Sequence, residues 1–118
     1  MSFRNLASPE DRLKSALTNA ICLTARQNGG IRIRNPVLHL NYDMTDLRAH
    51  LERRFELWMS WDNWGSYNGK SKTWQIDHVI PQSSLPFDDV DHPNFLKCWC
   101  LNNLRPLETT QNLSKGKR

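Results

Sequence analysis

The sequence lacks any long hydrophobic run, and no apolar stretch approaches the ~18 residues that a membrane-spanning helix requires. Its first five residues, Met1 to Asn5, also lack the apolar centre of a secretory signal peptide. Internal repeats and low-complexity segments are absent as well. These absences argue against membrane and secreted proteins, and we expect a cytoplasmic protein.

Cysteine is scarce: the chain has three, Cys22, Cys98 and Cys100, with no second pair to match the last two. An odd number without matched spacing supports neither a disulfide framework nor a four-ligand zinc site. Unpaired cysteine usually behaves as a small apolar side chain, so free buried thiols are expected. The alternative is that Cys98 and Cys100, on either side of Trp99, are metal ligands.

What the chain does contain indicates one small domain with a basic surface. The 118 residues suffice for a single domain, residues 1–118, and hydrophobic residues make up 38% of them and charged residues 24%. The net charge of +4 and isoelectric point near 9.2 favour contact with polyanions, because a cation that neutralises a phosphate releases a counterion. Charge alone is weak evidence, since many basic proteins bind no nucleic acid.

A first helix is predicted from Ser8 to Gln27. Ser8 suits an N-cap and Pro9 the first helical position. Apolar residues then recur at helical spacing until the glycine pair at 29–30 ends the helix. The following stretch, residues 31–40, permits either a short extended piece or a loop.

A second helix is predicted to begin near Thr45, where Asp43 and Asp46 offer a cap and favourable charge. Its apolar residues step by four, four and three along one face: Leu47, Leu51, Phe55 and Trp58. This stripe is interpreted as core, and the alternative is a helix that docks in a partner's groove. His50 is expected at the helix surface.

From Met59 the chain becomes aromatic and loop-like. Trp61, Trp64 and Tyr67 are interspersed with polar residues and followed by a turn signal at Asn68-Gly69. Small domains usually bury such rings, and burial is the preferred interpretation. The alternative is that exposed rings beside lysines stack on unpaired bases.

A strand is predicted from Thr73 to Ile80, rich in β-branched and aromatic residues and stopped by Pro81. It carries Asp77 and His78 side by side, and adjacent side chains of a strand point to opposite faces. In-line displacement at phosphorus places the attacking water and the leaving oxygen on opposite sides, so one residue can hold a metal while the other takes a proton. The alternative is an ordinary polar pair at a strand end.

A short helix is predicted after a polar connection, residues 82–91. Asp91 or His92 is expected to cap it, and Pro93 suits its first turn. The asparagine pair at 102–103 then ends this helix.

A second strand or turn is predicted at residues 104–107, followed by a final helix that Thr109 or Thr110 caps. Residues 73–118 thus form a module of strand, connection, strand or loop, and helix. They follow a helical extension with an aromatic loop, residues 1–72. The whole chain is predicted to be an α+β fold.

Three stretches of the C-terminal module resemble the HNH endonuclease family, whose fold is the ββα-metal motif. They are Trp74-Gln75-Ile76-Asp77-His78-Val79-Ile80-Pro81, Asn103-Leu104-Arg105-Pro106-Leu107 and Asn112-Leu113-Ser114-Lys115-Gly116-Lys117. The stretch from Leu51 through Gly65 is also similar to the lead-in of short HNH proteins from bacteriophages and prophages. That similarity implies a bacterial cell or a phage-infected host.

The resemblance implies a role for each matching residue. Asp77 falls at the family's first metal ligand, and His78 at the histidine that deprotonates water. Asn103 matches the middle asparagine, which holds the general-base loop and the histidine in orientation. Asn112 occupies the third position, where many members have a metal-binding histidine, and Lys115 matches a basic residue that often follows it.

Departures from the family pattern imply an oxygen-liganded site. An asparagine binds metal through its amide oxygen, so Asp77 and Asn112 suit one Mg²⁺ or Mn²⁺ ion better than a soft-ligand metal. Glu108 and Gln111 occupy the usual downstream cysteine positions. No structural zinc is therefore expected.

The activity that the resemblance implies is hydrolysis of a DNA phosphodiester at a single metal ion, with His78 as general base and products that carry 5′-phosphate and 3′-hydroxyl ends. Arg105, Lys115 and Lys117 are expected to contact the phosphates of double-stranded DNA. The base must be a neutral imidazole, so with an ordinary pKa of ~6.5 activity is expected to rise around neutral pH.

Other functions stay open at this point. One is a noncatalytic DNA-binding or packaging-associated module on an HNH scaffold, and another is an RNA nuclease. Candidate partners besides DNA are a second copy of the chain and phage packaging proteins. Nicking and double-strand cleavage both fit, because the outcome depends on whether dimerisation brings two sites together.

Overall fold

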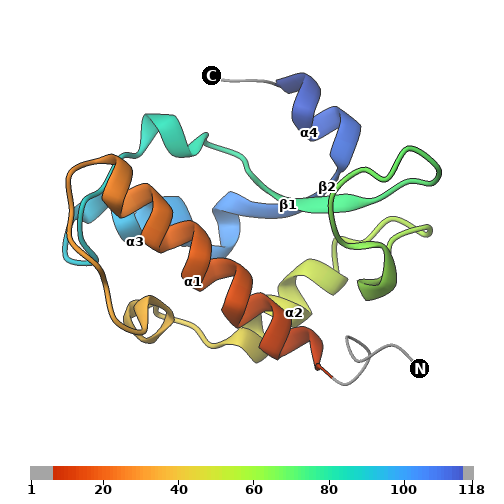
Figure 1. The fold of residues 1–118 in the computed structure, drawn as a ribbon. Helices are drawn as coiled ribbons and strands as arrows, with labels where there is room; N and C mark the ends of the chain where they lie inside the picture. The colour runs from red at the N-terminus through yellow and green to blue at the C-terminus, as the bar shows by residue number, and fades with distance from the viewer. Residues whose placement is uncertain (1–6, 116–118) are drawn as a thin grey trace.

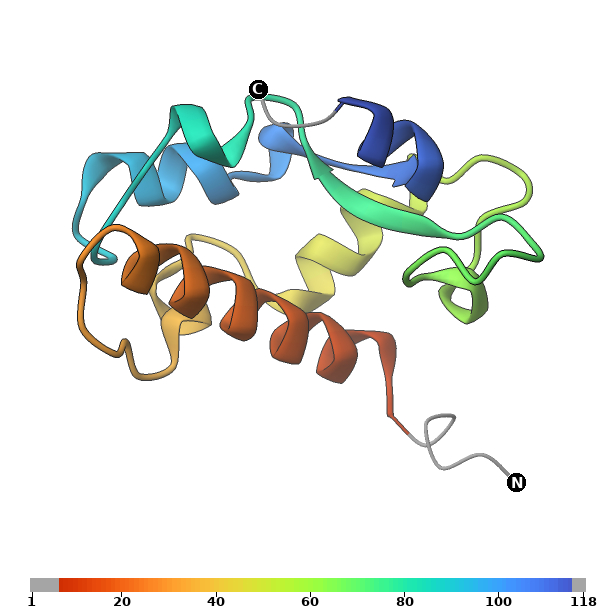
Figure 2. The same ribbon diagram turned by 45° about the horizontal axis from the view of Figure 1, so that its top comes forward.

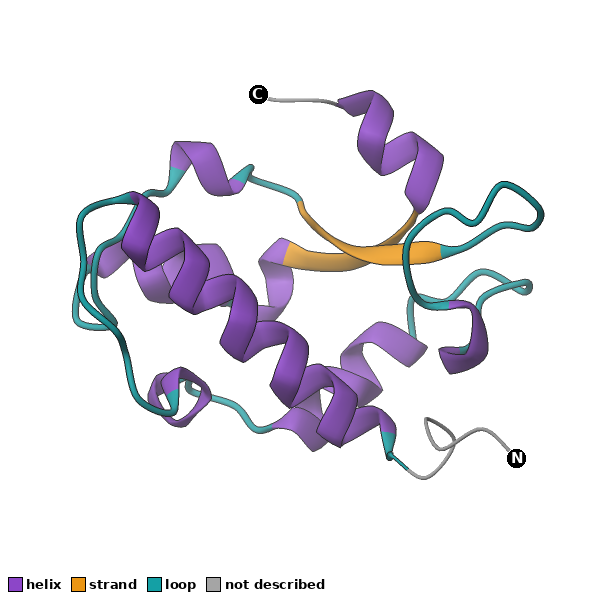
Figure 3. Cartoon of the chain, in the orientation of Figure 1, coloured by secondary structure: helices purple, strands orange, loops and turns teal. Residues whose placement is uncertain are grey.

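Four α-helices and a two-stranded antiparallel sheet make up the computed structural model, which describes residues 7–115 (Figure 1). This range is an α+β fold, as predicted (Figure 3). In chain order the elements are α1 (Pro9–Gln27), α2 (Met44–Glu52), β1 (Trp74–His78), α3 (Pro93–Trp99), β2 (Leu104–Glu108) and α4 (Thr109–Lys115). None of the helices in the described range has the length and hydropathy of a membrane span.

Helix α1 confirms the first predicted helix. The backbone N–H of Asp11 donates to the hydroxyl of Ser8 at 3.1 Å, and Pro9 occupies the first turn, where its missing N–H costs nothing. Every fourth side chain from Leu13 is buried: Leu13, Leu17, Ile21 and Ala25. Residues 31–40, for which the sequence permitted a short extended piece or a loop, form a loop with a 3₁₀ turn at Pro36–His39.

Helix α2 begins as predicted but ends early. Asp43 and Asp46 form a reciprocal capping box, with backbone-to-carboxylate distances of 2.8 and 3.1 Å. The helix has only nine residues, so the prediction that it extends through Phe55 and Trp58 is wrong. Phe55 leaves the helix and packs edge-on against Trp74, with ring centroids 5.0 Å apart. Burial against that ring, and not helical periodicity, decides where Phe55 lies.

The prediction that His50 lies at the surface is also wrong, because the residue is 3% exposed. Its Nε2 atom lies 2.8 Å from the carbonyl oxygen of Leu104, at the start of β2. A carbonyl oxygen only accepts, so this nitrogen carries the proton. Burial lowers the pKa of His50 and favours the neutral ring. The histidine therefore joins α2 to the sheet.

The two strands pair in antiparallel register, with Asp77 opposite Arg105 and His78 opposite Leu104. β1 is shorter than predicted, because Val79 and Ile80 lie beyond the pairing. Helix α4 covers one face of this two-stranded sheet, while α1 and α2 lie on the other (Figure 2). Successive residues of β1 therefore face different helices.

The remaining elements confirm the predicted order. His92 caps α3, accepting the backbone N–H of Asn94 at its Nδ1 atom over 3.0 Å. β2 then follows, and α4 begins at Thr109. The Thr109 hydroxyl accepts a hydrogen bond from Thr73 at 2.8 Å and donates to the carbonyl oxygen of Gly65 at 3.1 Å, which ties the hairpin to the aromatic loop.

The hydrophobic core draws on both the N-terminal extension and the C-terminal module. Buried side chains of α1, α2, β1, α3 and β2 form one cluster, with Trp74 fully buried in it. The three cysteines are free thiols; Cys98 is buried in the core, and Cys22 and Cys100 are half-buried. Burial raises the pKa of Cys98 to about 12, so this thiol stays protonated.

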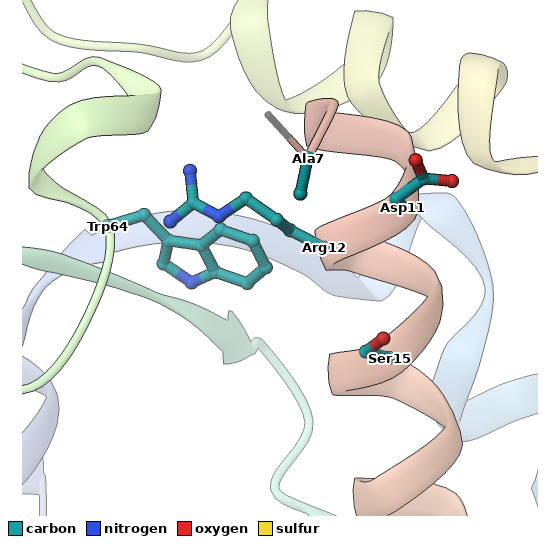
Figure 4. A pocket seen from close by; sticks show the side chains of 5 residues that line it. All are labelled: Ala7, Asp11, Arg12, Ser15 and Trp64. Atoms are coloured by element: carbon teal, nitrogen blue, oxygen red, sulfur yellow. The ribbon is translucent and has the colours of Figure 1, made fainter. Parts of the chain in front are cut away.

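The tryptophans of the aromatic loop pack on one another. Trp64 stacks on Trp74 with centroids 5.5 Å apart, and Trp61 meets Trp74 edge-on at 5.3 Å. Figure 4 shows the guanidinium of Arg12 over the ring of Trp64, at 5.0 Å from its centroid. These contacts support the burial interpretation for Trp61 and Trp64, whereas Tyr67 remains 52% exposed.

Candidate functional site

A buried carboxylate with two cationic partners lies at the centre of the sheet. Asp77 is 4% exposed, and its Oδ2 atom accepts from Nε of Arg105 at 2.8 Å. Its Oδ1 atom accepts from Nζ of Lys115 at 2.5 Å. Arg105 is its cross-strand partner, whereas Lys115 reaches it from α4. The three side chains together carry a net charge of +1, so the group is suited to a phosphate.

Helix α4 brings Asn112 to the same face of β1. Its Nδ2 atom donates to Oε1 of Gln75 at 3.2 Å. Gln75 and Asp77 are two residues apart and share a face of the strand, while Asn112 and Lys115 are one helical turn apart. Antiparallel pairing and α4 therefore bring together four of the predicted site residues: Asp77, Arg105, Asn112 and Lys115. Lys117 lies outside the described residues.

His78 faces the opposite layer, as alternation along a strand requires. It is 8% exposed and meets the ring of Trp99 edge to face. Both rings line a cavity of about 240 Å³, whose other side is formed by α1 residues such as Ala16 and Ala20. Nε2 of His78 and Nε1 of Trp99 are buried, and neither has a hydrogen-bond partner in the described part of the chain.

Burying a polar group without a partner is costly, so these two nitrogens are an unsatisfied feature beside the cavity. The indole N–H of Trp99 only donates, whereas a neutral His78 can accept at one ring nitrogen. Both nitrogens are inaccessible to solvent as the rings stand, so a water molecule could pair with either only after the rings move.

Electrostatics keep His78 neutral. Burial lowers its pKa to about 4; Asp77 raises that value and Lys115 lowers it further. The imidazole is therefore unprotonated at neutral pH and has a lone pair to accept a proton. The value is lower than the ordinary one assumed from the sequence, which makes His78 available over a wider pH range but a weaker base.

Asn103 fixes the chain directly after His78. Its Oδ1 atom accepts from the N–H of Ile80 at 2.7 Å, and its Nδ2 atom donates to the carbonyl oxygens of Cys98 at 2.9 Å and Ile80 at 3.2 Å. Its own carbonyl oxygen accepts from the N–H of Val79 at 2.9 Å. The side chain is thus a clamp on the segment after β1, and it holds the backbone of that segment.

The oxygen donors of Asp77 and Asn112 fit a hard divalent cation such as Mg²⁺ or Mn²⁺. Each oxygen of Asp77 already accepts from a cation, Arg105 or Lys115, so an ion bound there would compete with them and be repelled by their charge. Among the described residues, no three His, Cys, Asp or Glu side chains gather as a metal site. Two protein oxygens with waters and a substrate phosphate are the shell that this chain can offer.

Trp99 and Gln75 are the residues that sequence reasoning missed. Trp99 falls at the helical spacing of a core residue, and nothing in the local sequence says that it lines a cavity with His78. Gln75 could have been found, because it lies two positions before Asp77 on a predicted strand and therefore on the same face.

Comparison with known proteins gives a match to a viral protein over part of the chain. The chain matches no protein-family profile and no solved structure. It is 39% identical over 74 residues to the uncharacterized protein L426 of Acanthamoeba polyphaga mimivirus, which is 63% of this chain and 29% of that protein. The chain therefore spans less than a third of the length of this relative, whose name states no activity.

Proposed function

We propose that the chain is an HNH-type endonuclease that hydrolyses DNA phosphodiester bonds with the help of one divalent cation. The observation that carries the proposal is the convergence of β1, β2 and α4 on Asp77, with a neutral His78 as its direct neighbour. Two paired antiparallel strands followed by a helix are the order of the ββα-metal motif, and in this chain α3 lies in the connection between the two strands. Double-stranded DNA in the cytoplasm of the host cell is the proposed substrate.

Each residue of the site has a role in the proposed reaction. His78 takes a proton from the attacking water, whose oxygen forms a bond to phosphorus while the bond from phosphorus to the 3′ oxygen breaks. The leaving oxygen is protonated by solvent, which gives 5′-phosphate and 3′-hydroxyl ends. Arg105 and Lys115 bind the phosphate, and Asn103 is a positioning residue for the His78 segment.

The metal would be held by Asp77 and Asn112. When bound, it supplies Lewis-acid stabilisation of the charge that develops on phosphate. Lys115 donates to the same carboxylate, so its ammonium would lie beside a phosphate bound at this site. A second copy of the chain is required for double-strand cleavage in this scheme, since one chain has one site.

A noncatalytic DNA-binding module is the second candidate function. It is favoured by the pairing of both Asp77 oxygens with Arg105 and Lys115, which gives a positive site without any metal. Such a module, in packaging or regulation, binds DNA but cuts none. An RNA nuclease is distinguished from both by its substrate.

Plasmid nicking separates these functions. The protein is incubated with supercoiled plasmid and Mg²⁺, Mn²⁺ or EDTA, beside His78→Ala and a matched His39→Ala variant of an exposed histidine. The nuclease predicts metal-dependent nicking that is lost in His78→Ala and retained in His39→Ala. Binding without nicking identifies the noncatalytic module, and cleavage of structured RNA alone identifies the RNA nuclease. If His78→Ala nicks plasmid at the rate of the wild type, His78 is not the general base.

A further inference from the structure

A second basic feature lies away from Asp77 and His78. A groove of about 800 Å³ runs between α1 and the loop that follows it. Three arginines line it: Arg26 from the last turn of α1, and Arg32 and Arg34 from the loop. The other lining residues are polar or apolar, and none is acidic. We name this feature the arginine groove.

The arginines of this groove have no carboxylate partners. Arg48, Arg105 and Lys115 form the ion pairs of basic side chains in the described part of the chain. Arg26, Arg32 and Arg34 form none there, and all three are exposed. Like charges repel, so bringing three of them to one groove is unfavourable unless an anion binds between them.

The loop that carries two of these arginines is anchored. Ile33 is buried, and its carbonyl oxygen accepts from the thiol of Cys22 on α1 at 3.5 Å. Arg32 and Arg34 flank this buried residue, and both are exposed. At the loop start, Gly30 lies so close to the backbone of Asp88 that a Cβ atom would be 2.0 Å from its carbonyl oxygen. Two contacts thus anchor the backbone of the loop that carries Arg32 and Arg34.

Helix α1 separates the arginine groove from the cavity of His78. Ala16 and Ala20 line the cavity, whereas Asn19 and Arg26 line the groove. A phosphate in the groove is therefore not the one that the water activated by His78 would attack. The groove offers planar guanidinium groups, which bind phosphate oxygens in pairs, to another part of a polyanion.

We propose that the arginine groove binds the phosphate backbone of duplex DNA at a distance from the scissile bond. The identity of the ligand rests on the proposed function, and the charge complementarity is independent of it. The groove is open and its cations come from two separate segments, which suits successive phosphates of a long polymer. It would add affinity without sequence preference, because phosphate contacts carry no base information.

The test compares two variants of equal charge. One replaces Arg26, Arg32 and Arg34 with Gln, and the control replaces Arg53, Lys70 and Lys97, which are exposed basic residues outside the groove and without an ion pair among the described residues. Both are made in the His78→Ala protein, so that cleavage does not interfere. The probe is a fluorescent duplex longer than the 38 Å protein, hence more than about eleven base pairs at 3.4 Å each.

The groove variant is expected to lose at least tenfold in affinity at low salt, and the control variant clearly less. Three lost phosphate contacts reduce the slope of log affinity against log salt by about 2.7. Equal losses in the two variants, or no loss in the groove variant, overturn the proposal. A mononucleotide that binds the groove as tightly as the duplex overturns it too, because the ligand is then a small anion. Unchanged thermal unfolding verifies that both variants fold.

The outcomes separate this proposal from the proposed nuclease. If the wild type fails to nick plasmid but the groove variant alone loses duplex binding, the nuclease assignment fails and the groove stands. If the wild type nicks plasmid and both triple variants bind alike, the groove fails and the nuclease stands.

Discussion

The rings of His78 and Trp99 meet edge to face with centroids 4.5 Å apart, and the buried nitrogen of each is without a partner among the described residues. This relationship joins the candidate general base to a donor from α3. It suggests that Trp99 orients the molecule from which His78 takes a proton, as a positioning residue.

Trp99→Phe removes the donor and keeps an aromatic ring beside His78. We expect kcat for plasmid nicking to fall about five- to tenfold, the value of one hydrogen bond of roughly 1 kcal/mol, with KM little changed. Trp58→Phe is the control, since that indole donates to Glu56 at the surface. Equal rates for wild type and Trp99→Phe in single-turnover assays would exclude the positioning role.

The lowered pKa of His78 predicts an unusual pH profile. A general base acts in its neutral form, so activity rises with pH through the folded pKa of about 4 and not through the ordinary value near 6.5. Nicking measured from pH 5 to pH 8, at constant metal saturation, is therefore expected to show no limb due to His78. A limb near 6.5 that disappears in a His78→Gln variant with residual activity would show that substrate binding restores an ordinary pKa.

Local signals in the sequence sufficed for much of the fold. Ser8 and Pro9 mark the start of α1, and the aspartates at 43 and 46 mark the start of α2, because capping is decided within one turn. The end of α2 could not be predicted from such local signals. Phe55 continues the helical spacing, but its ring packs on Trp74, which lies nineteen positions later.

In the candidate site, too, local sequence signals predict some features, and contacts between distant residues decide others. Asp77 and Arg105 could be placed opposite each other only once the register between β1 and β2 was known. The partner of His50 is a carbonyl oxygen 54 residues along the chain, so nothing near His50 in sequence predicts its burial. Residue types and spacing identified the candidate ligands, whereas burial and ion pairing depend on tertiary contacts.

Two buried histidines predict a loss of stability in acid. The pKa values of His50 and His78 are lowered in the folded chain, so below ~6.5 the unfolded chain binds protons that the folded chain does not. The free energy of unfolding then decreases as pH falls from about 6.5 to the folded pKa, about 4 for His78. The size of this pKa shift limits the part of the pH-dependent decrease in the free energy of unfolding that is due to His78 to about 3 kcal/mol.

Urea unfolding at a series of pH values measures the effect. The double variant His50→Gln, His78→Gln removes both groups, and its stability is expected to change less than that of the wild type across this window. Carboxylates titrate in both proteins and cancel in the comparison. Parallel curves for the two proteins would mean that neither histidine is buried in its neutral form.

The pairing of Lys115 with Asp77 predicts competition between the lysine and a metal ion. The ammonium is 2.5 Å from Oδ1 of Asp77, where a divalent cation would bind. Lys115→Met removes this competitor and the repulsion between like charges, and keeps an apolar chain of similar length. We expect Mn²⁺ affinity, measured by calorimetry, to increase at least about tenfold, or 1.4 kcal/mol. DNA affinity decreases in the same variant, because a phosphate contact is lost.

Lys97→Met is the matched control, since that lysine is exposed on α3 and forms no ion pair within the described range. Asp77→Asn completes the comparison: it keeps an oxygen donor but removes the negative charge, and Mn²⁺ affinity is expected to fall. A Lys115→Met protein that binds Mn²⁺ no better than Lys97→Met, together with an Asp77→Asn protein that binds it as well as the wild type, would show that the ion does not bind at Asp77. The positive cluster would then serve phosphate binding alone, because its carboxylate would have no function other than to position Arg105 and Lys115.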